Sequence, residues 1–465
     1  MVALNIQKLN RIYRKLFVNN PNGLDVYFYF AVLVFCYFVF NHGDILQTAG
    51  SSFTYFNGHI NDFYEINKLL FVDTNTYLPF TYILFAIWNI PIKLLGIVNQ
   101  ATMNVGYVIF WYKLLTTLFF VGSAFCFYKI GKAIGLNKAN STLLTIIWIS
   151  SPILIFSQFV FGQVDIFTMF FVLLGLYYFI KKNIWLFILF FSIAITFKYF
   201  PMFIFIPLIL LVEKNPKKIF LYFTSVLIPT CLQVLFYVGS SVFRMDVIEA
   251  GHALPRLTAA FITVGPDINI YLFLLFWFII SGLCYYLKPI EDKNKFYQTV
   301  FYVCLLVSCV LFILISWHPQ WVLFITPFLA ITTFMHRKIK EFLFLDFIMM
   351  FAFVGVSVAV FQINVDQDMF RLGVLGRFNM NLFDPEKTLR MAKLFILGKN
   401  MYSTLFRSLL ILNILCKFPN KANQWSGGEN LAAVGTYWNY ARLRFFGGMA
   451  IFIIPAFICF FYTLK

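Results

Sequence analysis

Long apolar segments follow one another along most of this 465-residue chain and leave few positions for charge. Hydrophobic residues make up 61% of the sequence and charged residues 12%, whereas a soluble domain carries roughly 25% charged residues. A soluble protein of this size cannot bury so much apolar surface. The composition therefore excludes a soluble enzyme, a disordered chain and a secreted disulfide scaffold. It predicts a multi-pass protein of the cell membrane, surrounded by the lipid bilayer.

A helix that crosses the bilayer needs about 20 mainly apolar residues. Thirteen segments reach or approach this length, so we predict an all-α polytopic membrane protein of about 13 transmembrane helices in a single domain over residues 1–465. The short segments on either side of residues 198–201 predict a broken helix that lines a cavity. The predicted spans cover residues 25–40, 107–128, 141–157, 166–180, 184–197, 201–212, 219–238, 271–287, 298–315, 321–335, 341–361, 400–416 and 445–464.

The excess of Lys and Arg that cytoplasmic segments carry indicates the orientation. With segment 77–95 placed outside as an interfacial helix, the inner segments hold an excess of +15 and the outer segments +2, which together give the formal net charge of +17. Counting 77–95 as a fourteenth span would move the basic residues near Lys129, Lys181 and Lys217 outside. We therefore predict a cytoplasmic N-terminus, and we attribute the positive charge to topology rather than to nucleic-acid binding.

Long connections fall mainly on the predicted outer side. The outer loops cover residues 41–106, 239–270 and 362–399, and one long cytoplasmic loop covers residues 417–444. The first outer loop is predicted to carry interfacial helices. Because long loops in a compact protein are usually functional or disordered, three on one face predict an active site on the extracellular face.

Two carboxylates of the first outer loop are candidate catalytic bases. Asp44 follows the first predicted span by about one helical turn, and Asp62 lies further along the loop. A carboxylate at a membrane–water cavity can take a proton from an acceptor hydroxyl, because partial burial raises its pKa toward the working pH. Each could equally be an ordinary solvated acid. The stretch 44–56 has helical character, and its polar residues are predicted to face water.

Polar residues near the outer ends of later spans are candidate substrate ligands. Gln163 and Asp165 follow Gly162, where they could bind a sugar or form a tight turn with a helix cap. Lys198 and Tyr199 interrupt a long apolar stretch. A lone cation at that depth needs an anionic partner, such as a lipid-linked phosphate or Asp165, or a route to the interface.

An aromatic segment follows the ninth predicted span and places His318 between two tryptophans. His318 could donate a hydrogen bond to a phosphate or a sugar oxygen, with Gln320 beside it. Trp317 and Trp321 could stack on a sugar face, although an interfacial aromatic belt has the same composition.

Arginines of the outer loops are candidates for phosphate binding. Arg371 and Arg377 stand in the loop 362–399, which is basic against the charge trend, and guanidinium groups bind phosphate bidentately. A solvated surface helix would carry the same residues. Arg244 and Arg256 are weaker candidates of the same kind.

Motifs for nucleotides and metals do not occur. The sequence has no P-loop, no Rossmann glycine pattern and no HExxH motif, and the eight cysteines show no zinc-binding spacing. We therefore expect no cofactor, no metal and no nucleotide chemistry on the inner face.

Taken in order, the motifs resemble a GT-C glycosyltransferase, the class of polytopic enzymes that use polyprenyl-phosphate sugars. The pattern is similar to the mannosyltransferases of glycolipid and cell-wall assembly, and it covers most of the chain. It departs from the commoner Asp-Glu or Asp-x-Asp pair, since Ile45 and Leu46 follow Asp44, and this leaves Asp62 as a rival base. The resemblance rests on Asp44, Asn57, Gly58, Tyr77, Pro79, Tyr82, Pro91, Gly162, Gln163, Asp165, His318, Pro319 and Gln320.

The resemblance implies inverting, metal-independent transfer of a sugar from a polyprenyl-phosphate donor to a hydroxyl of a glycan or glycolipid acceptor. Asp44 would be the base, while Lys198, His318 and the loop arginines would stabilise the departing phosphate. Two other functions stay open. One is a transporter or flippase for a lipid-linked glycan, to which a broken helix is also suited. The other is a polysaccharide polymerase that uses diphosphate lipids.

Overall fold

The computed structural model describes residues 23–70, 76–97, 107–249, 253–361, 369–370, 372–378, 397–423, 425 and 438–463. Within these ranges the chain is helical, apart from connections and one short antiparallel hairpin. The elements are α2 (Gly23–Val39), α3 (Gly43–Ser51), α4 (Phe53–Phe56), α5 (Phe63–Leu70), α6 (Pro79–Leu94), α7 (Val108–Ala133), α8 (Lys138–Ile149), α9 (Pro152–Ile155), η1 (Phe156–Phe161), α10 (Asp165–Ile180), α11 (Ile184–Phe197), α12 (Phe200–Val212), α13 (Pro216–Tyr237), α14 (Ser241–Phe243), η2 (Arg244–Glu249), α15 (Ala253–Leu257), β1 (Phe261–Thr263), β2 (Asn269–Tyr271), α16 (Leu272–Tyr286), α17 (Lys293–Leu314), η3 (Pro319–Ile325), α18 (Thr326–Phe334), α19 (Ile339–Phe361), α21 (Leu375–Phe378), α23 (Lys399–Cys416), η6 (Lys421–Asn423), α24 (Trp438–Arg442), η8 (Leu443–Gly447) and α25 (Gly448–Thr463).

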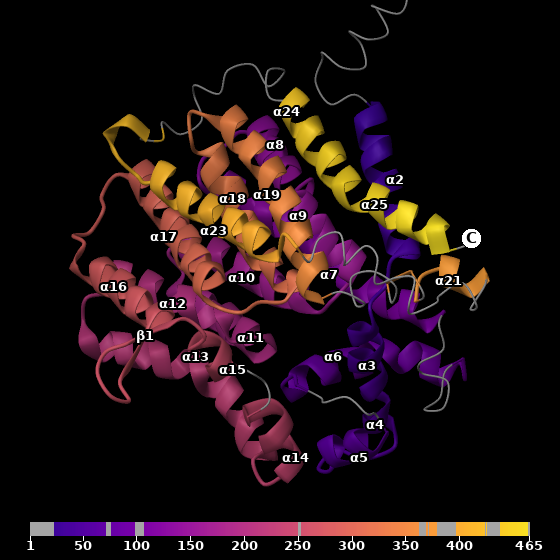
Figure 1. Cartoon of the computed structure of the whole chain (residues 1–465). Coiled ribbons are helices and arrows are strands. Elements are labelled where there is room, and N and C mark those ends of the chain that lie inside the picture. The colour runs from indigo at the N-terminus through magenta and orange to yellow at the C-terminus, as the bar shows by residue number, and fades with distance from the viewer. Residues whose placement is uncertain are drawn as a thin grey trace, which may run out of the picture.

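The helices pack into a bundle, and a smaller group formed by α3–α6 and α14 lies at one end of it (Figure 1). Five of the described helices are long and apolar enough to cross a membrane, or up to seven if each of two bent helix pairs counts as one span. Six shorter apolar helices accompany them. An all-α membrane protein is therefore confirmed, whereas the count of thirteen spans is not and stays a prediction.

Breaks in the helices bring polar residues to the ends of apolar segments. The predicted break at Lys198 is confirmed: α11 ends at Phe197, Lys198 is extended, and α12 begins at Phe200 with Pro201 in its first turn. Proline suits the start of a helix because it has no N–H to leave unpaired there. A second break bends α2 against the α3–α4 segment by 69°. Each break leaves backbone groups and polar side chains without helical partners.

The small polar residues of α3 and α4 are buried, so the prediction that they face water was wrong. Ser51 and Thr54 have almost no exposed surface. Ser52 accepts a 3.0 Å hydrogen bond from the side-chain amide of Asn89 on α6, and Thr54 donates one of 3.0 Å to Asn67 on α5. Small side chains allow close packing of these helices, and their hydroxyls pair within the packed layer.

Candidate active site

Five connections between helices meet at one end of the bundle, and all five were predicted to lie on the outer side. They are the α2–α3 bend, the turn between η1 and α10, the α11–α12 break, the connection from α13 to α16 that contains α15, and the connection from α17 to η3. Side-chain contacts join them in turn. We call their charged and titratable residues the site cluster, which comprises Asp44, Asp165, Lys198, Arg256 and His318.

Asp44 stands at the first turn of α3, directly after the bend that follows α2. Its carboxylate accepts a hydrogen bond from the side-chain amide of Gln163, and His42 Nδ1 lies 3.2 Å from Asp44 Oδ1. The His42 ring in turn stacks on Phe161 at the end of η1, with ring centroids 4.5 Å apart. The Asp44 side chain nevertheless keeps 49% of its surface exposed. The carboxylate is thus held in place and still open to a reactant.

Asp165 and Lys198 form an ion pair between α10 and the α11–α12 break. Their side chains are 1% and 9% exposed. Asp165 is therefore the anionic partner that a cation at this depth requires, in place of the helix-cap role considered for it. Removing one member of such a pair leaves a buried charge without compensation, at a cost of about 3–5 kcal/mol.

Trp321 lies between the two cations of the site cluster. Lys198 Nζ is 4.7 Å and the Arg256 guanidinium carbon 4.6 Å from the centre of its ring. The His318 ring packs against the same tryptophan, with centroids 5.1 Å apart. Both cations can interact with the electron-rich face of the indole, which holds their positive charges near one another.

The electrostatics of this group favour a neutral imidazole. Burial, together with the charges of Arg256 and Lys198, lowers the pKa of His318 to about 3. Asp44 lies close enough to Lys198 for their charges to interact. Burial opposes ionisation of Asp44, but neighbouring positive charge and side-chain hydrogen bonds hold the pKa of its carboxyl below the usual value, so the expectation of a raised pKa was wrong. His318 is therefore a neutral hydrogen-bond partner at physiological pH, while Lys198 and Arg256 supply the positive charge.

Several buried polar atoms around the site cluster have no hydrogen-bond partner among the described residues. They are Oε1 of Gln163, Oδ2 of Asp165, the hydroxyl of Tyr199 and Oε1 of Gln320. Buried polar atoms are rarely left unpaired in a folded protein, because each costs about 1–3 kcal/mol. A bound polar molecule or water could pair with these four atoms.

Lys113 connects the end of α2 to η1 through hydrogen bonds, and the sequence analysis did not predict this role. Its Nζ donates to the backbone carbonyls of Tyr37 (2.9 Å) and Phe40 (2.6 Å) near the end of α2, and to that of Phe159 (2.6 Å) in η1. A cation stabilises helix C-terminal ends, where carbonyls are unpaired. Gly162, in the left-handed conformation at φ +68°, leaves room for this chain, since a Cβ there would lie 3.1 Å from Lys113 Cε. The sequence signal was a single lysine inside the apolar segment 107–128.

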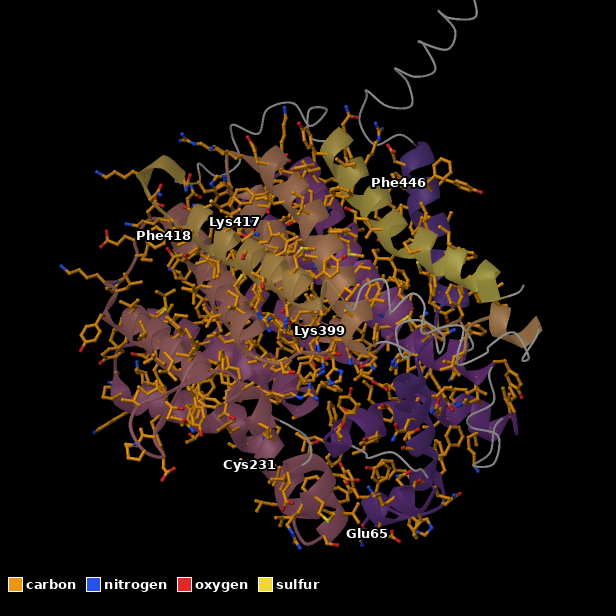
Figure 2. All side chains as sticks on the ribbon, in the orientation of Figure 1. Glu65, Cys231, Lys399, Lys417, Phe418 and Phe446 are labelled. Atoms are coloured by element: carbon orange, nitrogen blue, oxygen red, sulfur yellow. The ribbon has the colours of Figure 1, made fainter. Side chains whose placement is uncertain are left out.

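Not every predicted site residue reaches this cluster. Asp62 pairs with His59 at 2.9 Å beside α5, and among the described residues it forms no ion pair with a member of the site cluster. Glu65, three residues further on, lies at the opposite end of the molecule from Lys417 (Figure 2). Trp317 packs in parallel with Phe353 of α19, at a centroid distance of 6.1 Å, rather than beside the cations.

Of the four candidate arginines, the structure places Arg256 in the site cluster and Arg244 elsewhere, which the sequence did not indicate. Arg256, a weaker candidate, stands over Trp321, whereas Arg244 donates to the carbonyl of Val238 (2.6 Å) after the end of α13. Arg377 belongs to α21, and its side chain lies outside the described part of the chain. Arg371 lies outside the described residues altogether.

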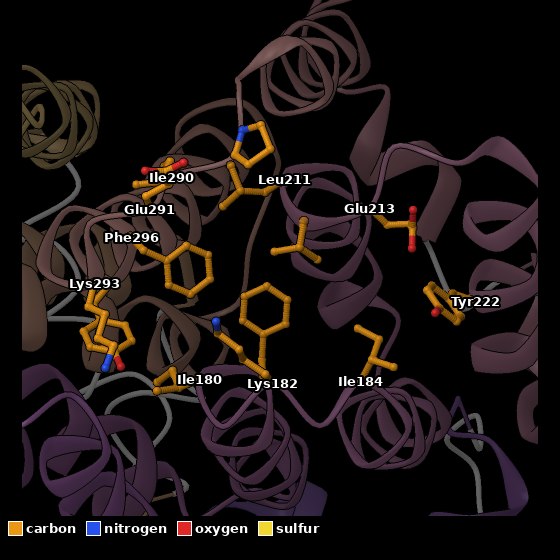
Figure 3. Close-up of a pocket in the computed structure, with 14 residues that line it drawn as sticks. Ile180, Lys182, Ile184, Leu211, Glu213, Tyr222, Ile290, Glu291, Lys293 and Phe296 are labelled. Atoms are coloured by element: carbon orange, nitrogen blue, oxygen red, sulfur yellow. The ribbon is translucent and has the colours of Figure 1, made fainter.

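A well-formed cavity of about 440 Å³ lies elsewhere, among the ends of α10, α12 and α17 (Figure 3). Lys182, Glu213, Glu291 and Lys293 surround it, and all four belong to connections predicted to be cytoplasmic. None of the residues that line it carries an unpartnered buried side-chain atom. The cavity thus lacks the convergent, unsatisfied polar groups that distinguish the site cluster.

The geometry thus places an accessible carboxylate close to two cations in a helical membrane protein, and the comparison with known families gives the class of protein, a membrane glycosyltransferase of the GT-C type. The model of glycosyltransferase family 87 matches residues 75–335, which is more than half of the chain, and the protein belongs to this family. The matched region contains Gln163, Asp165, Lys198, Arg256 and His318, and Asp44 precedes it. Neither a curated protein nor a solved structure matches the chain.

Proposed function

We propose that this glycosyltransferase moves a sugar from a polyprenyl-phosphate donor to a hydroxyl of a glycan or glycolipid acceptor on the outer face of the cell membrane, with inversion at the anomeric carbon. The observation that carries this proposal is the position of Asp44. Its half-exposed carboxylate lies near Lys198, which is buried, and near buried hydrogen-bonding atoms that have no partner among the described residues. A base and a phosphate site next to each other are what this reaction requires.

Asp44 is the base in the proposed reaction. Its carboxylate takes the proton of the acceptor hydroxyl while the hydroxyl oxygen attacks the anomeric carbon from the face opposite the phosphate. The bond between that carbon and the phosphate oxygen breaks, and its electron pair leaves with the polyprenyl phosphate. The proton on Asp44 then passes to solvent. Gln163 orients the carboxylate through the hydrogen bond that it donates.

The cations hold the leaving group. Negative charge builds on the phosphate as the bond breaks, and fixed positive charge in a poorly solvated site stabilises it. Arg256 and Lys198 take this role in the proposal, because both lie against the ring of Trp321. Neutral His318 and the hydroxyl of Tyr199 donate hydrogen bonds to the phosphate. The unpartnered amide oxygens of Gln163 and Gln320 accept hydrogen bonds from sugar hydroxyls.

A reconstituted assay tests the proposal. Purified protein in liposomes is given a polyprenyl phosphate that carries a radiolabelled sugar, and label transferred to glycolipid acceptors is measured. We expect transfer from the monophosphate donor with release of polyprenyl phosphate. Transfer only from diphosphate-linked donors would favour a polymerase, and movement of label across the bilayer without transfer would favour a flippase.

A further inference from the structure

An apolar hairpin projects from the connection between α15 and α16. Strands β1 and β2 pair antiparallel, with Ile262 opposite Ile270. All six strand residues are exposed. Because successive side chains of a strand point to opposite faces, neither face of this hairpin packs on the protein. The apolar side chains that it exposes are Phe261, Ile262, Val264, Ile268, Ile270 and Tyr271.

The polar side chains of the two strands are paired with each other, whereas Asp267 in the turn is exposed. Thr263 donates a 2.9 Å hydrogen bond to Asn269, and the backbone N–H of Val264 donates one of 2.8 Å to the carbonyl of Ile268. An isolated two-stranded hairpin is marginally stable in water. One that exposes apolar side chains on both faces and satisfies its polar side chains internally is suited to a lipid environment.

The hairpin continues into a lipid-facing surface. β2 ends at Tyr271 and α16 begins at Leu272 without a break. α16 exposes a row of apolar side chains, among them Phe276, Phe278, Ile279 and Leu283. α13, which crosses the membrane by its length and composition, is also largely exposed, and the hairpin lies on the same side of the molecule (Figure 1). In a membrane protein such a surface faces lipid chains.

We propose that the hairpin of residues 261–271 inserts among the lipid chains of the bilayer beside α16. It lies near the interface rather than at the bilayer centre, because the outer edges of a two-stranded sheet leave backbone groups that need water or headgroups. Arg256 lies five residues before Phe261 and belongs to the site cluster. Insertion of the hairpin therefore holds α15, which contains Arg256, close to the membrane surface. Membrane insertion of the hairpin does not depend on the reaction proposed above.

Spin labels measure the surroundings of the hairpin directly. Phe261→Cys and Ile262→Cys place a nitroxide on each face in turn, in a full-length background with Cys231, Cys416 and Cys459 changed to serine. Accessibility to oxygen, which concentrates in lipid, is compared with accessibility to a water-soluble nickel chelate in liposomes. Leu283→Cys, on the exposed apolar side of α16, is the lipid control, and Asp292→Cys, in the charged connection before α17, is the water control.

We expect both hairpin labels to behave like the label at position 283, with oxygen access far above chelate access. Chelate access equal to that at position 292 would place the hairpin in water and overturn the proposal. Labels that neither reagent reaches would show that protein, such as a second copy of the chain, covers the hairpin, and would overturn it as well. The measurement needs no sugar donor, so a negative result leaves the proposed reaction untouched.

Discussion

Two buried groups of charged side chains in the bundle differ in what surrounds them. The second group, which we call the Asp346 cluster, comprises Asp346, Arg444 and Lys417. Arg444 donates to Asp346 at 3.1 Å and to Ser150 at 3.0 Å. Lys417 donates to Thr333 at 2.7 Å. All three side chains of the Asp346 cluster are buried, whereas Asp44 of the site cluster is half exposed.

The comparison shows that charge within an apolar chain does not by itself mark an active site. The cations of the Asp346 cluster bind helix groups: Arg444 donates to the carbonyl of Ile147, and Lys417 to that of Leu329 at 3.2 Å. They join α8, α18, α19 and α23. In the site cluster, the groups lie at helix ends, in helix breaks and in the short helix α15, and the carboxylate of Asp44 remains exposed. We therefore expect accessibility, rather than burial of charge, to separate a catalytic role from a structural one.

The largest effect on turnover is expected from Asp44→Asn. The amide keeps the shape of the carboxylate and removes the proton acceptor, so turnover should fall by about 10²–10⁴, the usual contribution of general-base catalysis. Donor binding and thermal stability should stay near those of the unchanged protein. The measurement is steady-state transfer in liposomes together with binding of labelled donor.

Asp62→Asn is the matched control for Asp44, because it changes another carboxylate of the same loop. Its turnover should be unchanged, since Asp62 pairs with His59 away from the site cluster. Loss of transfer in Asp62→Asn with activity retained in Asp44→Asn would reverse the assignment of the base.

Asp346→Asn should give the opposite pattern to Asp44→Asn. It leaves the buried guanidinium of Arg444 without its counter-charge, and the free energy of unfolding should fall by about 3–5 kcal/mol. Turnover per folded molecule should be retained. Thermal unfolding in detergent, combined with activity normalised to folded protein, separates the two quantities. A stable variant without activity would show that the distinction between the two clusters is wrong.

Arg256→Met should weaken binding of the donor and leave the stability of the fold unchanged. A hydrogen bond to a charged group contributes about 1.5–3 kcal/mol, which corresponds to a rise of roughly 10- to 100-fold in the KM for the donor. Arg256→Lys keeps the charge and should recover part of the loss. Arg244→Met is the control, since Arg244 binds the carbonyl of Val238 instead. Equal effects of Arg256→Met and Arg244→Met would assign both to loop structure.

The smallest effect is expected at His318 and concerns pH. The pKa of His318 in the folded protein is about 3, below the value of roughly 6.5 for an unfolded chain. Below pH 6.5 the unfolded chain therefore binds a proton that the folded protein does not. The free energy of unfolding consequently decreases as the pH is lowered. His318→Gln removes this coupling, so it should lose less stability than the unchanged protein between pH 6.5 and 5. Unfolding temperatures at both pH values provide the comparison, and parallel curves would contradict the neutral, buried imidazole.

Sequence reasoning succeeded where a local pattern has one physical outcome. The break at Lys198 follows from a cation and a proline between two short apolar segments, and α11 and α12 end and begin there. It failed for α3, where small polar residues looked solvated but pack against α6 and α5. Such packing depends on helices up to about 40 positions away. Hydropathy alone carries no information on those partners.

The sequence by itself determined that this chain is a helical membrane protein. Its long apolar segments suit the bilayer, and a helix pairs the backbone N–H and C=O groups of each segment within the segment itself. The sequence also determined which residue types could bind a phosphate or remove a proton. Only the tertiary structure decided that the charges of Asp44 and Lys198 interact and that Arg256 contacts the same tryptophan as Lys198. It also decided that Lys113 joins the end of α2 to η1. These relations join segments far apart in the chain, and they are set by how helix ends meet in space rather than by the order of residues along any one helix.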